Sequence, residues 1–275
     1  MPGVDLRDRA IAITGASSGI GRATAISCAQ AGMDIALGAR RLDRLEAVAG
    51  EVRAVGRRAE VFEVDVGESG KCHEFIDHAA SAFGRLDAVF ANAGYGFEAP
   101  TLDRPIEDHR RMFEVNFWGS LETVRAAIPH LRRSDVGHAL LCSSCLSKIG
   151  LPCYAAYCAT KAAQDFYGRA LRVELAPAGV AVSTVHPIGT TTEFFDTMRG
   201  QSGGSISLDP KSGFPMQPPE RVARAIVRRL RKGRGAEVWT SLTTRLLLAI
   251  ALAAPGLTDR ALARKARERD MTGEP

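Results

Sequence analysis

The chain has 275 residues, of which 45% are hydrophobic and 24% charged, enough for one large globular domain with a full core. Its formal net charge of +5 does not indicate nucleic-acid binding, because only 6% of residues are aromatic and no basic run is interleaved with stacking side chains. Basic residues are dense only at 221–234 and 260–269, and we interpret most of them as solvated helix faces.

The cysteines indicate a reducing compartment. They stand at positions 28, 72, 142, 145, 153 and 158. Cys142 and Cys145 have the spacing of metal ligands, but a zinc site needs four converging ligands. Cys142 ends an apolar, strand-like run and Cys158 falls within a helical stretch, so we expect buried free thiols and no metal site. Residues 1–7 lack the apolar core of a signal peptide, and we therefore expect a cytoplasmic protein.

Short apolar strands alternate with helices along most of the chain. Strands are expected at 10–14, 34–37, 61–64, 88–91, 139–142, 180–186 and 237–240. Helices are expected from the first strand to residue 31, at 42–55, around 75–79, and at 106–131, 155–175 and 221–231. This alternation predicts an α/β fold, a single doubly wound Rossmann-type domain with a mostly or wholly parallel sheet of about seven strands. We assign it to residues 1–241, including a long substrate loop at 190–219.

The remaining residues, 242–275, form an apolar and basic tail that we expect to be helical. Its apolar run, 246–254, is too short to span a bilayer, which needs about 20 residues. Basic residues flank the run at Arg245 and, beyond it, at Arg260, Arg264, Lys265 and Arg267. The simpler interpretation, which we favour, is a helix that caps the substrate cleft or an oligomer interface. The alternative is peripheral contact with a membrane through residues 242–269.

A glycine-rich turn follows the first strand, in the run Thr14-Gly-Ala-Ser-Ser-Gly-Ile-Gly21. Glycines allow the backbone to turn tightly and to approach a pyrophosphate, whose charge the amides of the following helix then meet. The spacing is Gly-x3-Gly-x-Gly, not the commoner Gly-x-Gly-x2-Gly. A plain tight turn is the alternative, but the position between the first strand and first helix favours dinucleotide binding.

Tyr157 and Lys161 stand four residues apart in an expected helix, so both side chains lie on one face. A phenol titrates near pH ~10, and a neighbouring positive charge favours its ionised form. The pair can therefore act as an acid–base group. Taken alone it could equally be a pair on an exposed helix surface.

These motifs together resemble those of the short-chain dehydrogenase/reductase family. Five of them occur in order, namely Thr14-Gly-x3-Gly-x-Gly21, Asn92-Ala93-Gly94, Asn116, Ser144 and Tyr157-x3-Lys161. Ser144 precedes Tyr157 by thirteen residues, as in that family. The resemblance covers roughly residues 5–240 and implies an oxidoreductase that transfers a hydride between a nicotinamide cofactor and a carbonyl or alcohol.

The resemblance implies a role for each catalytic residue. Tyr157 would protonate a carbonyl oxygen or deprotonate an alcohol, and Lys161 would lower its pKa and hold the nicotinamide ribose. Ser144, a better candidate than Ser143 on spacing, would donate a hydrogen bond to the substrate oxygen. Asn116 would hold a water that links Lys161 to solvent. A non-catalytic dinucleotide sensor on the same fold is the rival interpretation, but it predicts loss of these residues.

The resemblance also implies the cofactor contacts. They are Gly15, Ser17, Ser18, Gly19, Ile20 and Gly21 at the pyrophosphate, Asp65 and Val66 with Asn92, Ala93 and Gly94 along the adenine side, and Tyr157, Lys161, Pro187, Ile188 and Thr192 around the nicotinamide. The family usually reads Pro-Gly-x-Val-x-Thr after its sixth strand, whereas Ile188 here replaces the first glycine and Gly189 follows one position late. Ser147 likewise stands where a glycine is common.

The end of the second strand predicts the cofactor to be NADP(H). Enzymes that use NAD usually carry an acidic residue there to bind the ribose hydroxyls. The matching position is Ala39, and the cationic Arg40 and Arg41 follow, which can pair with a 2′-phosphate. The alternative is that both arginines begin a solvated helix and the enzyme uses NAD.

The expected substrate walls are mostly apolar. They comprise Tyr95, Phe97, Leu146, Ile149, Tyr154, Phe194, Phe195, Met198 and Phe214. Such a lining favours a hydrophobic ketone, aldehyde or secondary alcohol, with a lipid-like, steroid-like or retinoid-like compound weakly supported by the apolar tail. The resemblance further implies a homodimer or homotetramer formed through the helices at 106–131 and 155–175. NADP(H) suggests reduction, but the sequence leaves the direction and the substrate open.

Overall fold

The computed structural model describes residues 3–202 and 216–267, with side chains to Arg264. Its centre is a sheet of seven parallel strands in the order β3-β2-β1-β4-β5-β6-β7. The strands are β1 (Ala10–Thr14), β2 (Asp34–Ala39), β3 (Ala59–Glu63), β4 (Ala88–Ala91), β5 (His138–Cys142), β6 (Ala181–His186) and β7 (Glu237–Trp239). The predicted doubly wound Rossmann-type fold is confirmed.

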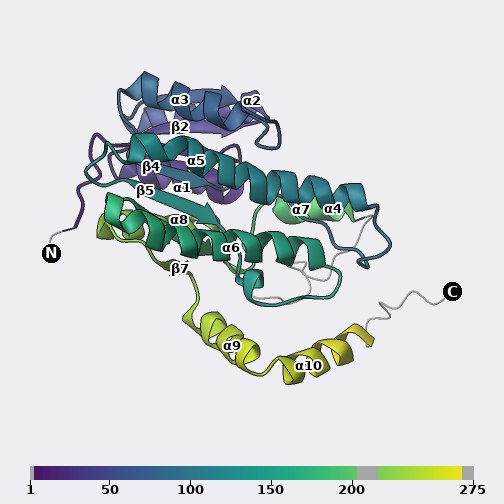
Figure 1. The fold of residues 1–275 in the computed structure, drawn as a ribbon. Coiled ribbons are helices and arrows are strands. Elements are labelled where there is room, and N and C mark those ends of the chain that lie inside the picture. The colour runs from purple at the N-terminus through teal and green to yellow at the C-terminus, as the bar shows by residue number, and fades with distance from the viewer. Residues whose placement is uncertain (1–2, 203–215, 268–275) are drawn as a thin grey trace.

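Helices cover both faces of this sheet (Figure 1). The first face carries α1 (Gly19–Gln30), α2 (Leu42–Ala54) and α8 (Pro219–Lys232), whose apolar residues share one core cluster. The second face carries α3 (Lys71–Phe83), α5 (Gly119–Leu131) and α6 (Ala155–Leu175), which share another. Because both faces are covered, the central strands are buried throughout, which explains their continuous apolar sequences.

The helix expected at 106–131 contains a break. It consists of α4 (Ile106–Phe113), a five-residue π-helical turn at Glu114–Trp118, and α5. The turn holds the buried Asn116, one of the predicted catalytic residues. Such turns are rare and occur mostly at functional sites, so the break marks the place where this long helix passes the site.

The predicted substrate loop is partly helical. Helix α7 (Phe194–Gln201) lies within 190–219, where the sequence predicted a loop. The two ends of this segment are joined, because Thr190 and Gln217 form a β-bridge. The amide of Gln217 donates to Gly189 O at 2.8 Å, and Thr191 donates back to Gln217 O at 2.9 Å. The predicted wall residue Phe214 lies outside the described residues.

The chain continues after β7 as two helices, α9 (Leu242–Ala253) and α10 (Pro255–Arg267). They form an arm set apart from the sheet (Figure 1). Ser241 caps the start of α9, where its hydroxyl accepts a hydrogen bond from the Thr244 amide at 3.2 Å. None of the described helices is by itself long and apolar enough to cross a membrane; α9 and residues 255–264 reach that length together but are bent by 107°.

One buried carboxylate ties the amino-terminal ends of three strands together. Asp87, which is 2% exposed, directly precedes β4 and accepts a hydrogen bond from the amide of Ala10 in β1 at 2.9 Å. Its own carbonyl accepts from His138 of β5 at 2.9 Å. Arg85 pairs with the carboxylate at 2.7 Å, and Ser134 donates to it at 2.7 Å. Burial alone would raise the pKa of Asp87, but these hydrogen bonds lower it overall.

Replacing this carboxylate should weaken the fold. Asp87→Asn removes the negative charge and one of the two oxygens that accept from Arg85, and is expected to lower the free energy of unfolding by about 2–3 kcal/mol at neutral pH, measured by urea titration. The folded pKa lies below the unfolded value near ~3.9, so the contribution is complete above that value and is lost as pH falls through the folded pKa. The difference from the native protein should therefore shrink below about pH 4. Asp77→Asn, at an exposed carboxylate, is the control; equal effects would contradict the assignment.

Candidate active site

The glycine-rich turn packs tightly against the segment that follows β4. Gly15 has φ of 65°, and a Cβ placed on it would lie 2.9 Å from Cα of Ala93. A Cβ on Gly21 would lie 2.2 Å from the carbonyl oxygen of Gly15. Both positions therefore require glycine. This close approach leaves the start of α1 facing a cavity, with its amides positioned to meet an anion.

Asn92 holds the turn in this position. Its side-chain amide donates to the carbonyls of Thr14 at 3.0 Å and Gly15 at 3.3 Å. In return, the hydroxyl of Thr14 accepts the backbone amides of Asn92 at 3.0 Å and Ala93 at 3.2 Å. The carboxyl ends of β1 and β4 are thus tied directly together.

A cavity of about 680 Å³ lies at these carboxyl ends. It brings together nearly all the predicted site residues: Gly15, Ser17, Ser18, Gly19, Ile20, Arg40, Arg41, Asp65, Val66, Asn92, Ala93, Gly94, Ser144, Tyr157, Lys161, Pro187, Ile188 and Thr192. Gly21 and Asn116 do not line it. Gly21 acts by allowing the turn to pack, as described above.

The predicted acid–base residues lie on α6 and open into this cavity. Tyr157 is half-buried, and burial raises the pKa of its phenol well above the ordinary value, although a hydrogen bond with Ser144 acts in the opposite direction. Lys161 is buried, and burial lowers the pKa of its ammonium. Its Nζ donates to the Cys142 carbonyl at 2.8 Å and lies 5.8 Å from the centroid of the Tyr157 ring.

That Lys161 lowers the pKa of Tyr157 stays a prediction, because in this structure the net effect of the surroundings is to raise the pKa of the phenol. The phenol lies among apolar and thiol groups, so loss of solvation outweighs the effect of charges nearby. Tyr157 is consequently held as a neutral phenol, which can donate a proton.

Ser144 stands between β5 and a 3₁₀ turn at Cys145–Lys148. Its hydroxyl accepts the amide of Leu146 at 3.1 Å, which fixes the side chain at the start of that turn. The neighbouring Ser143 instead donates its hydroxyl to the carbonyl of Lys161 at 2.9 Å and so anchors α6 to the sheet. The geometry therefore agrees with the choice of Ser144 over Ser143 as the residue available to a substrate.

Asn116 lies behind the cavity, not in its wall. Its side-chain oxygen accepts the amide of Tyr95 at 2.9 Å, and its amide donates to the carbonyl of Tyr95 at 2.8 Å and to the Thr160 hydroxyl at 3.2 Å. All these bonds hold the segment after Gly94 against α6. The proton-relay role implied by the resemblance stays a prediction.

Two arginines at the end of β2 have different surroundings. Arg41 pairs with Glu193 at 3.1 Å and donates to the hydroxyls of Ser17 and Ser18, each at 3.2 Å. Arg44 also pairs with Glu193. Arg40 is exposed and makes no hydrogen bond or ion pair with any other described residue. The preceding residue, Ala39, has a buried side chain. The cavity wall at the end of β2 therefore carries cations but no carboxylate from β2.

The predicted substrate walls lie mostly in the same cavity. Of the predicted walls, it includes Tyr95, Phe97, Leu146, Tyr154, Phe194, Phe195 and Met198, but not Ile149. Arg104, Asp108 and Arg111, which were not predicted from the sequence, also line the cavity. Arg104 pairs with Asp108 at 3.1 Å and lies over the ring of Phe97, 4.7 Å from its centroid. Arg111 pairs with Asp65 at 2.8 Å.

Comparison with known proteins agrees with this geometry. Residues 9–203 match the family model of the short chain dehydrogenases. An uncharacterized oxidoreductase of Listeria monocytogenes is 31% identical over 225 residues, which cover 80% of this chain and 90% of the relative. The chain belongs to the short-chain dehydrogenase/reductase family. It is therefore an oxidoreductase with a dinucleotide-binding fold.

Two solved structures show what related enzymes bind. An alcohol dehydrogenase from Thermococcus sibiricus, in complex with 5-hydroxy-NADP, is 32% identical, with a TM-score of 0.74 over 84% of this chain and 95% of that one. A short chain dehydrogenase from Mycobacterium paratuberculosis, bound to NAD, is 28% identical, with a TM-score of 0.74 over 86% and 97%.

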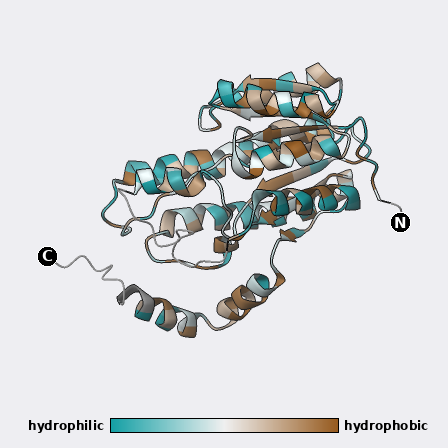
Figure 2. Ribbon diagram, turned by 180° about the vertical axis from the view of Figure 1, so that it is seen from behind, coloured by the Kyte–Doolittle hydropathy of each residue, from teal (hydrophilic) through white to brown (hydrophobic). Residues whose placement is uncertain are grey.

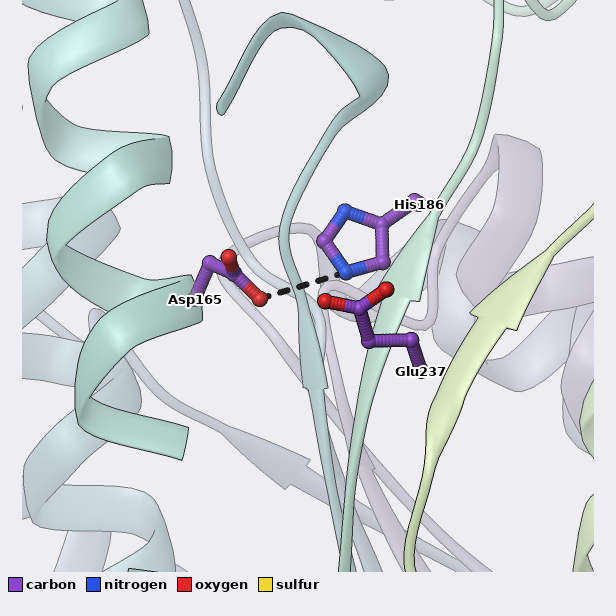
Figure 3. Close-up of side chains that lie close together, drawn as sticks. All are labelled: Asp165, His186 and Glu237. Carbon is purple, nitrogen blue, oxygen red and sulfur yellow. Dashed lines mark ion pairs between the residues drawn. The ribbon is translucent and has the colours of Figure 1, made fainter. Parts of the chain in front are cut away.

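A buried charged cluster supports the active site of this oxidoreductase from behind. Figure 3 shows the ring of His186 beside Asp165 of α6 and Glu237 of β7. Nε2 of His186 lies 3.3 Å from the Asp165 carboxylate, and Nδ1 lies 3.1 Å from the carbonyl of Ser144. The indole of Trp239 stacks on the imidazole, with ring centroids 4.5 Å apart. The cluster thus connects the segment of Ser144 to α6 and β7.

Lys148 supplies the positive charge of this cluster. Its Nζ lies 2.5 Å from Asp165 and 3.1 Å from Glu237. Asp165, His186 and Glu237 could by type hold a metal ion, but the ammonium already pairs with both carboxylates. Burial would raise the pKa of Asp165, whereas its hydrogen bonds with His186 and Lys148 lower it well below the ordinary range. Since Lys148 ends the turn that begins after Ser144, this pairing fixes the turn on α6.

Removing the charge of Asp165 should destabilise the protein markedly. Asp165→Asn leaves the Lys148 ammonium and His186 without their buried partner, and we expect a loss of about 3–5 kcal/mol in the free energy of unfolding, measured by urea denaturation. Glu174→Gln, at an exposed carboxylate on the same helix, should change it by no more than about 0.5 kcal/mol. A small effect of Asp165→Asn would show that the cluster does not hold the turn.

Proposed function

We propose that this protein is an NADP(H)-dependent oxidoreductase that interconverts a ketone or aldehyde and the corresponding alcohol, on an apolar substrate. The observation that carries the proposal is the single cavity that joins Ser144, Tyr157 and Lys161 to the glycine-rich turn. The tight fit of Gly15 against Ala93 leaves room there for a dinucleotide backbone.

Each residue has a defined part in the proposed reaction. The neutral phenol of Tyr157 donates its proton to the carbonyl oxygen, and the hydroxyl of Ser144 donates a hydrogen bond to the same oxygen. Lys161, whose ammonium is held by the Cys142 carbonyl, stabilises the phenolate that this transfer leaves. When bound, the nicotinamide cofactor supplies the hydride in reduction or takes it up in oxidation. Because cells usually keep the NADP(H) pool reduced, reduction is the direction that we propose.

Arg40 supports NADP(H) as the cofactor. Relatives of this fold bind either NAD or NADP-type cofactors, so the preference has to come from residues of this chain. Arg40 is exposed at the end of β2 and is not engaged by a carboxylate among the described residues, whereas Arg41 is partly neutralised by Glu193. A 2′-phosphate would give Arg40 its counter-charge. NAD remains the rival cofactor, and a carboxylate at Ala39 would be its usual signature.

The wall composition supports an apolar substrate. Tyr95, Phe97, Leu146, Phe194 and Met198 surround the end of the cavity next to Tyr157. The charged residues Arg104 and Arg111 are paired with Asp108 and Asp65, so they offer little to a charged substrate. A hydrophobic ketone, aldehyde or secondary alcohol matches this arrangement.

We also propose how the chain is organised. Residues 1–241 form the catalytic domain and 242–275 a separate tail, with peripheral membrane contact through 242–269; residues 268–275 lie outside the described part of the chain. Exposed apolar side chains at Trp118, Phe166 and Val173 support a dimer or tetramer formed through the helices at 106–131 and 155–175. All six cysteines are free thiols, which supports a reducing compartment such as the cytoplasm.

Replacing the catalytic phenol tests the proposed reaction. Apolar and polar ketones and aldehydes are supplied with NADPH, and its absorbance is followed; we expect faster turnover of the apolar carbonyls. Tyr157→Phe removes the proton donor and should lower kcat by about 10²–10⁴-fold while NADPH still binds. Tyr167→Phe, on the same helix and outside the cavity, should leave kcat unchanged. NADPH binding with no turnover of any carbonyl would instead favour the dinucleotide-sensor interpretation.

Charge reversal at Arg40 tests the cofactor assignment. Arg40→Asp removes the partner for the 2′-phosphate and adds a carboxylate that can bind ribose hydroxyls, so the ratio of kcat/KM for NADPH to that for NADH should fall by about 100-fold. The matched variant Arg132→Asp, at an exposed arginine after α5, should leave the ratio unaltered. An unchanged ratio in Arg40→Asp would refute the assignment.

A further inference from the structure

The arm formed by α9 and α10 carries most of its large apolar side chains on the outside. Leu242, Leu246 and Ile250 stand four residues apart on one face of α9 and are 71%, 64% and 66% exposed. Thr244 and Leu248 lie on the opposite face and are only partly covered. A helix that caps a globular domain has the reverse arrangement, with its large apolar residues buried. No residue of α9 is buried. That the tail caps the substrate cleft or an oligomer interface stays a prediction.

The exposed surface is both apolar and basic, and the two parts are separate. Figure 2 shows hydrophobic residues along α9 and a more hydrophilic α10. Leu247, Leu252 and Leu257 add to the exposed apolar surface. In sequence, α10 holds Arg260, Arg264, Lys265 and Arg267 against a single acidic residue, Asp259. Apolar side chains beside a basic segment match the boundary between acyl chains and anionic headgroups.

The dimensions of the arm favour lying on a bilayer. Twelve residues make α9 about 18 Å long, against a hydrocarbon core of about 30 Å. The bend of 107° at Ala254 turns α10 away from the line of α9. The hydroxyl of Thr258 helps to hold the corner, because it donates to the carbonyls of Ala251 at 3.0 Å and Ala254 at 3.2 Å.

We propose that α9 and α10 form a docking surface for an anionic lipid bilayer, and that this docking places the mouth of the active-site cavity against the lipid. Helix α9 packs on the 3₁₀ turn Cys145–Lys148, whose Cys145 and Leu146 line the cavity. An apolar carbonyl or alcohol dissolved in the bilayer then enters the cavity without crossing water. The entry of substrate from the bilayer rests on the proposed reaction, whereas lipid docking specifies the peripheral membrane contact proposed for residues 242–269 and does not depend on that reaction.

A second copy of the chain is a weaker candidate for the same surface. Its arm would present the same basic α10, so pairing would bring like charges together, whereas an anionic bilayer matches both the apolar and the basic part. The exposed leucines also extend beyond the narrow seam that pairs helices in a coiled coil.

Vesicle flotation of the full chain tests the docking. We expect the native protein to float with vesicles of phosphatidylcholine and phosphatidylserine, and less with phosphatidylcholine alone. The triple variant Leu246→Ser, Leu247→Ser and Ile250→Ser should bind at least about tenfold more weakly, and Arg260→Gln with Arg264→Gln should lose the preference for phosphatidylserine. All these side chains are exposed, so both variants should melt like the native protein. The control Leu42→Ser, Val55→Ser and Leu102→Ser removes exposed apolar groups elsewhere and should float normally.

Failure of the native protein to float, or flotation of the triple variant at the native level, would overturn the docking. If the triple variant only lowers the molar mass seen by light scattering, the surface is a contact between copies, and the proposal is wrong.

Delivery from lipid is tested with one apolar ketone embedded in vesicles and one water-soluble ketone. The triple variant should lose turnover of the embedded ketone and keep that of the soluble one; equal turnover of both would refute delivery. Flotation without reduction of any carbonyl would instead count against the proposed function alone.

Discussion

The site depends on the hydrogen bonds that join the carboxyl ends of β1 and β4. Strand order reverses here, with β2 on one side of β1 and β4 on the other, so the two following loops diverge and leave a crevice between them. Asn92 and Thr14 close the base of that crevice by pairing backbone and side chain in both directions. The glycines of the turn bring no side chain to this contact. The position of the turn's backbone is therefore fixed by the hydrogen bonds from the segment that follows β4. Cofactor recognition is therefore a property of two strands together.

The fold, and the meeting of Ser144, Tyr157 and Lys161 in one cavity, could be predicted from the sequence because their signals are local. Buried parallel strands read as short apolar runs, and α6 is regular enough that the four-residue spacing of Tyr157 and Lys161 fixes their common face. Arg104, Asp108 and Arg111 could not be found in this way. Whether they reach the cavity depends on how the π-helical turn at Glu114–Trp118 directs α4, and nothing in their spacing records that direction.

The environment of a group was harder to predict than its position. The sequence placed Lys161 next to Tyr157 correctly, yet the effect on the phenol depends on how much water the packed site excludes, which no spacing shows. The cluster of Asp165, His186, Glu237 and Lys148 is a stronger example. Its members come from four separate segments. They meet only because β6 and β7 are neighbours in the sheet and α6 packs beside them. The helix α7 was missed for a related reason, since its short sequence lies in a stretch rich in turn-forming residues.

Asp87 and the cavity lie at opposite ends of the same strands, and this has a consequence for how the protein can change. The amino-terminal end holds ion pairs that connect strands and touch no cavity residue, whereas the carboxyl-terminal end holds every group proposed for chemistry. Substitutions at the first end therefore alter the reserve of stability without disturbing the second. Strained or destabilising substitutions at the carboxyl-terminal end can then be tolerated, because the contacts at the amino-terminal end supply the stability that they remove. Substitutions that change substrate choice can therefore occur at one end of the sheet without breaking the contacts that hold the fold at the other end.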